Sequence, residues 1–143
     1  MRHITAAVLF AATLTACSSG TTSPGSATAQ TNQPAVQREI GRAFDIKIGE
    51  TIAVGELKLT FQRVANDSRC PIDAICVWAG DAEIALRIEQ GSQAAVAALH
   101  THLEPKQTVW NGYTIQFVSL APSQSSASPI DPSRYQAQLV VTR

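Results

Sequence analysis

Two histidines and a glutamate close together in the sequence are the side chains with the clearest metal-binding character. His100, His102 and Glu104 occupy alternate positions along the chain. Residues i and i+2 of a β-strand point to the same face, so both imidazoles could reach one ion, with the carboxylate as a third ligand. On a helix the same pair would diverge. A metal site here depends on a strand, and solvent-exposed histidines are the commoner arrangement.

Two cysteines could form a disulfide, a redox pair or half of a metal site. Five residues separate Cys70 from Cys76, whereas a redox pair usually has two intervening residues. A zinc–thiolate site would need two more ligands nearby. We therefore expect a structural disulfide, which would contribute on the order of 2 kcal/mol by closing a short loop.

The third cysteine follows a segment typical of an export signal. Residues 1–3 carry positive charge, and the apolar run at 4–14 is too short for a transmembrane helix. The segment Leu14-Thr15-Ala16-Cys17 resembles the lipobox of bacterial lipoproteins. That resemblance implies a signal peptide at residues 1–16 and a diacylglycerol and a fatty acyl chain such as palmitate on Cys17, which would anchor the chain to a membrane. An ordinary signal peptide cut near Ala16 is the alternative.

The predicted location is the bacterial cell envelope, facing the periplasm. Ser18 stands where an aspartate is associated with retention in the inner membrane of Gram-negative cells, so the outer membrane is favoured in such a host. Residues 17–38 are rich in Ser, Thr, Gly, Pro and Gln, a composition that predicts a flexible linker. The folded domain is expected at residues 39–143.

Composition excludes some functions and leaves others without support. Equal numbers of basic and acidic residues, 11 each, argue against nucleic-acid binding by bulk electrostatics. The sequence has no G-x-S-x-G, no H-E-x-x-H and no glycine-rich phosphate loop. We therefore expect neither an enzyme nor a cofactor.

Five segments alternate apolar and polar residues with a period of two, which is typical of strands buried on one face. Turn residues such as Asn111-Gly112, a hairpin signal, separate several of them. Together they predict an all-β fold, a small antiparallel β-sandwich or barrel of about six to eight strands. The apolar positions are Phe44, Ile46 and Ile48; Leu57, Leu59 and Phe61; Ile84, Leu86 and Ile88; Tyr113, Ile115 and Phe117; and Tyr135, Ala137, Leu139 and Val141.

Two segments lack this alternation. Residues 93–99 are alanine-rich, which favours a helix by intrinsic propensity, but their place between two strand-like segments favours a strand. Residues 122–133 are rich in Pro and Ser and predict a long surface loop.

The cysteine pair lies within the string Asp67-Ser68-Arg69-Cys70-Pro71, four residues, Cys76, one residue, Trp78-Ala79-Gly80. This DSRCP-x4-C-x-WAG arrangement resembles a group of small bacterial envelope proteins, many of which carry lipoprotein signals. The similarity extends from about Ile48 to the C-terminus and implies a fold and a location, with no established activity.

The same string has a physical interpretation of its own. Asp67 can bond to backbone N–H groups at the loop entrance, Arg69 can pair with Asp67, Asp73 or Asp81, and Trp78 can pack over the disulfide. A stapled loop that carries Asp67, Arg69, Asp73 and Trp78 could be a scaffold or could bind a partner, since Arg and Trp are frequent interface hot spots. The sequence thus predicts a lipid-anchored binding module with an unidentified envelope partner or ligand. A periplasmic metal-binding protein and an inhibitor of an envelope hydrolase are the alternatives.

Overall fold

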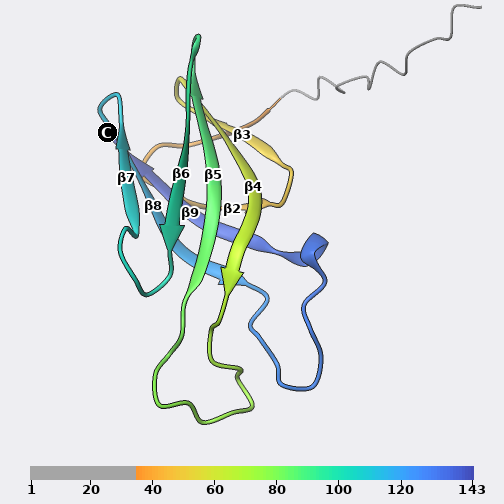
Figure 1. Ribbon diagram of the computed structural model, residues 1–143. Helices are drawn as coiled ribbons and strands as arrows, with labels where there is room; N and C mark the ends of the chain where they lie inside the picture. The colour runs from red at the N-terminus through yellow and green to blue at the C-terminus, as the bar shows by residue number, and fades with distance from the viewer. Residues whose placement is uncertain (1–34) are drawn as a thin grey trace, which may run out of the picture. The chain divides into compact units, whose positions relative to one another are not determined.

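The computed structural model describes residues 35–143. The predicted signal peptide, the lipidation site Cys17 and most of the linker lie outside the described residues. Within this range the chain forms nine strands in two sheets, with a single 3₁₀ turn at Pro132–Arg134. The predicted all-β fold is confirmed: of the sandwich and the barrel, the structure is the sandwich, with nine strands where about six to eight were expected (Figure 1). In residues 35–143 no helix has the length and apolarity needed to cross a bilayer.

The larger sheet has the strand order β1-β3-β4-β5-β6. All of its neighbours are antiparallel except β1 and β3. Its longest strand, β4, contains two irregularities in its pairing with β5. The strands are β1 (Val36–Arg38), β3 (Thr51–Val54), β4 (Leu57–Asp67), β5 (Ala82–Gln90) and β6 (Gln93–His100).

The smaller sheet has the order β2-β9-β8-β7 and is antiparallel throughout. The turn between β7 and β8 is the predicted Asn111-Gly112 hairpin, and both residues have positive φ, 46° and 82°. Asparagine and glycine tolerate this conformation with the least strain. The strands are β2 (Ala43–Lys47), β7 (Gln107–Trp110), β8 (Tyr113–Ala121) and β9 (Gln136–Thr142).

The core fills the space between the two sheets and consists of the predicted alternating positions. All of the predicted apolar residues are buried except Ile48, which is half-buried and packs against the core. Each fully buried aliphatic or aromatic side chain contributes roughly 1.5–3 kcal/mol. Asp81, which directly precedes β5, is the most deeply buried charged residue in the described part, with 2% of its surface exposed.

The alanine-rich segment is a strand, β6, as its position favoured and against its helical propensity. Pairing with β5 over eight residues outweighs an intrinsic preference that is worth only tenths of a kcal/mol per residue. The linker boundary differs from the prediction, because Val36–Arg38 form β1 and pair in parallel with β3. These three residues are exposed and have no alternating pattern, so periodicity could not indicate a strand.

Candidate functional site

The loop between β4 and β5 contains the predicted disulfide, and Cys70 and Cys76 are bonded. Two backbone hydrogen bonds close the base of the loop: Ser68 N donates to Asp81 O at 2.7 Å, and Cys70 N donates to Ala79 O at 2.8 Å. The loop and the β8–β9 connection extend from the same end of the domain (Figure 1).

Gly80 makes the closed base possible. Its φ is +71°, and a Cβ at this position would lie 1.9 Å from Ser68 O and 2.8 Å from Arg69 Cα. Any side chain would therefore force the two sides of the loop apart. Close backbone packing therefore requires a glycine at this position.

Arg69 forms a two-point ion pair with Asp67 inside the base of the loop. Nε donates to Oδ1 and Nη2 donates to Oδ2, both at 2.7 Å. Only 12% of the arginine side chain and 6% of the aspartate side chain are exposed. Of the three aspartates that the sequence offered as partners, the structure selects Asp67. This geometry matches the fork of the guanidinium to the carboxylate.

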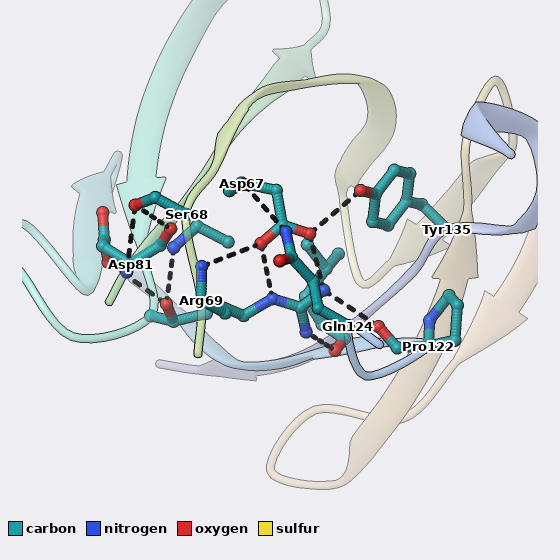
Figure 2. A network of polar contacts seen from close by, with 10 residues as sticks. Asp67, Ser68, Arg69, Asp81, Pro122, Gln124 and Tyr135 are labelled. Atoms are coloured by element: carbon teal, nitrogen blue, oxygen red, sulfur yellow. Dashed lines mark hydrogen bonds and ion pairs between the residues drawn. The ribbon is translucent and has the colours of Figure 1, made fainter. Parts of the chain in front are cut away.

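The same ion pair joins the loop to the β8–β9 connection (Figure 2). Arg69 also donates to the carbonyl oxygen of Leu120 and, at 2.9 Å, to that of Pro122. The hydroxyl of Tyr135 donates to Asp67 Oδ2 at 2.9 Å. Three segments distant in sequence are thus held by one buried charge pair.

The electrostatics of this network follow from burial and hydrogen bonding. Burial acts to raise the pKa of Asp67, but hydrogen bonds from Arg69 and Tyr135 outweigh it and hold that pKa below its usual value. Burial, followed by the hydrogen bond to the Asp67 carboxylate, raises the pKa of Tyr135 to about 12. The aspartate is therefore a structural anion, and the tyrosine stays protonated as its donor.

Asp73, which lies between the two cysteines, binds the loop to the β8–β9 connection. Its carboxylate accepts from the backbone N–H of Ser126 at 2.9 Å and from the Ser126 hydroxyl at 2.8 Å. Ile72 N donates to Gln124 O at 3.0 Å. The loop therefore has contacts on its flank as well as at its base.

The tip of the loop exposes large apolar side chains. Ile72 is 78% exposed, Ile75 and Val77 are fully exposed, and Trp78 is 57% exposed. We call these four residues the apolar tip. Such side chains, grouped on a loop with a closed base, are typical of a binding surface.

The predicted partner-binding residues therefore divide into two groups. Asp67 and Arg69 hold the loop from inside, and Asp73 binds the neighbouring loop. Trp78 is the one member of the predicted set that offers a largely exposed apolar surface. Sequence reasoning missed Ile72, Ile75 and Val77, although three apolar residues without alternation beside a cysteine pair were a usable signal.

The predicted metal ligands are arranged differently from expectation. Strand β6 ends at His100, so the same-face relation does not extend to His102. His100 Nδ1 lies 2.7 Å from Asp81 Oδ2, and it must donate because a carboxylate only accepts. Among residues 35–143, no three His, Cys, Asp or Glu side chains, Glu104 included, are grouped as a metal site.

Asp81 instead organises the turn that follows β6. Its Oδ1 accepts from the backbone N–H of His102 at 2.8 Å and of Leu103 at 3.2 Å, and from the Thr101 hydroxyl at 3.1 Å. Burial acts to raise the pKa of Asp81, but hydrogen bonds from His102, His100, Leu103 and Thr101 prevail and lower it to about 2.

Neither a protein-family model, nor a curated protein, nor a solved structure matches this chain. The chemistry of the site is therefore inferred from its geometry. A buried charge pair holds a stapled loop, and the part of that loop that faces solvent carries the four side chains of the apolar tip beside the exposed carboxylate of Asp73.

Proposed function

We propose that the domain is an interaction module of the bacterial cell envelope, held at the membrane by a lipid on Cys17, that binds a partner protein through the apolar tip. The observation that carries this proposal is the exposure of Ile72, Ile75, Val77 and Trp78 on a loop fixed at its base and flank. Burying this surface against a partner would contribute roughly 25 cal/mol per Å² of apolar area.

Rigidity of the loop supports the same function. A flexible loop would lose conformational entropy on binding, at roughly 0.5–1.5 kcal/mol per ordered side chain together with its backbone cost. The disulfide, Gly80 and the Arg69–Asp67 pair already fix the backbone. The apolar tip is thus preorganised for binding.

The test is site-specific photocrosslinking in the native envelope. A photoreactive amino acid at Val77 should crosslink to a discrete partner protein, whereas the same residue at Val109 on β7, which is 66% exposed, should not. A variant with Ile75→Ser, Val77→Ser and Trp78→Ser should lose the partner and keep its melting temperature, because these side chains are mostly exposed to solvent. Equal crosslinking from both positions, or a partner retained by the triple variant, contradicts the proposal.

Inhibition of an envelope hydrolase is the second candidate, and the stiffness of the projecting loop favours it. A loop that does not rearrange on binding can block an active-site cleft. Purified protein should then reduce cell-wall lysis by a target hydrolase, and the triple variant should restore it. Lysis that proceeds at the same rate with either protein speaks against inhibition of that hydrolase.

A further inference from the structure

Strand β6 is an edge strand without an Asp, Glu, Lys or Arg side chain, and β7 of the smaller sheet lies near it. It lies at the end of the five-stranded sheet opposite β1 and pairs only with β5. Natural edge strands are commonly short or carry charges that prevent pairing with other chains. Among the edge strands of residues 35–143, β1 and β7 are short, and β2 carries Asp45 and Lys47. Strand β6 has eight residues and contains no Asp, Glu, Lys or Arg; His100 is its last residue.

The register shows which backbone groups of β6 face outward. The Gly91-Ser92 turn closes on the pair Gln90 and Gln93, so alternate residues from Gln93 onward bond to β5. Thr101 N donates to Ala82 O, in phase with this set, and His100 N donates outward to Pro105 O. The remaining outward set is Ala94, Val96 and Ala98, and in the described residues their N–H groups have no protein partner.

Other residues of the domain contact both ends of this free stretch. Asn111 Nδ2 donates to the side chain of Gln93 at 2.8 Å, and Pro105 accepts from His100 at the other end. The open run is therefore limited to residues 94–99.

The sequence of this run is palindromic. Ala94-Ala95-Val96-Ala97-Ala98 reads identically in both directions about Val96. A two-fold axis through Val96 would place Ala94 opposite Ala98 of a second copy and Val96 opposite itself, each pair exchanging two hydrogen bonds. The facing side chains are small and apolar, so neither size nor charge opposes the approach. The nearest charges on β5, Arg87 and Glu89, neutralise each other in an ion pair at 2.9 Å.

We propose that β6 is a homodimerisation edge, at which two copies of this chain join their five-stranded sheets antiparallel about Val96. The occupant is a second copy because the edge is complementary to itself in hydrogen-bonding phase, side-chain size and charge. This proposal does not depend on the apolar tip, which belongs to a different loop.

Cysteine crosslinking of the full chain tests the register. Paired residues of this type lie about 5.5 Å apart at Cα, within the range that a disulfide spans. Val96→Cys should give a covalent dimer on a non-reducing gel. Ala94→Cys should not, because the two copies of residue 94 would be four residues out of register, about 13 Å apart. The chain without an added cysteine is the control on the same gel, because any covalent dimer that it forms would come from Cys17.

Molar mass by light scattering provides the second measurement. The detergent-solubilised full chain should have the mass of two copies, and Val96→Lys should halve it, because the two lysines would place like charges directly opposite each other. Val109→Lys is the control: Val109 lies on the edge strand β7 and is 66% exposed, against 57% for Val96, and its substitution should leave the mass unchanged. A monomeric unmodified chain, larger polymers, or a dimer that survives Val96→Lys each overturn the proposal, as would capture of a foreign peptide strand by a monomer.

Discussion

Arg69 connects two distant segments of the chain through one planar group. Its acceptors are the Asp67 carboxylate and two carbonyls that lie 51 and 53 residues further along. A lysine could offer only a point charge at this position and could not grip both carboxylate oxygens. The sequence suggests Arg69 as a surface hot spot for binding. In the structure its side chain is instead buried and links segments within the domain.

Replacing Arg69 should be costly. Arg69→Ala leaves the Asp67 carboxylate, 6% exposed, without its cation, and breaking a buried pair costs about 3–5 kcal/mol. Urea denaturation measures the loss. Arg42→Ala removes an ion pair whose side chains are 81% and 75% exposed, and it should leave the midpoint unchanged. Similar midpoints for the two variants would contradict the internal role of Arg69.

Gly80→Ala should be among the most destabilising single substitutions in the domain. The new Cβ meets backbone atoms at 1.9 and 2.8 Å, so relief requires opening the loop base. We expect a loss above about 4 kcal/mol, in the range that marks a specific structural fault. Gly91→Ala is the control, since its φ is +59° but nothing lies within 4 Å, and it should cost only about 1–2 kcal/mol. Equal losses would show that backbone strain alone acts at Gly80.

Asp81 should make stability depend on acid pH. Its pKa is about 2 in the folded domain and near 3.9 in an unfolded chain. A lowered pKa stabilises the fold above the unfolded value, and that contribution, about 2 kcal/mol, is lost as pH falls from about 5 to 2. Urea denaturation at both ends of this range, compared with Asp81→Asn, isolates the effect. A parallel fall in both proteins would assign the acid sensitivity to other carboxylates, such as Asp67.

At the level of elements, what could be predicted was local. The period-two segments predicted the core strands, and Asn111-Gly112 predicted its hairpin, because both signals lie within a few neighbouring residues. Strand β1 was missed because its exposed residues gain their structure from a partner elsewhere in the chain. Likewise the sequence offered Arg69 three aspartates, and Tyr135, 68 residues from Asp67, had no local sign of its role.

The disulfide should stabilise the loop more than the sandwich. Replacing Cys70 and Cys76 together with alanine removes a crosslink over a sequence separation of six, worth about 2 kcal/mol in the chain-entropy model. Gly80 and the Arg69–Asp67 pair remain, so the strands should persist. Hydrogen exchange should therefore accelerate within residues 71–79 and stay slow in β5. Exchange that accelerates throughout the domain would mean that the disulfide holds the core itself.

At the level of the whole molecule, the proposed lipid anchor decides where the domain acts. Cys17→Ser should move the chain from the membrane fraction to the soluble fraction, because the thioether that carries diacylglycerol cannot form. Fractionation and intact mass measure the change. The melting temperature of the domain should stay the same, since the strands and the core described above lie in residues 35–143. A chain that remains in the membrane fraction without acyl mass would require another mode of attachment.

The short parallel strand β1 has a mechanical consequence. A pull transmitted along the chain from the N-terminal side reaches Val36–Arg38 first, and three residue pairs with β3 resist it. None of these side chains is buried, so peeling the strand away removes no side chain from the core. The connection to the anchor would lengthen by about 10 Å while the two sheets stay intact. Under tension, β1 should therefore detach from β3 before the two sheets of the sandwich separate.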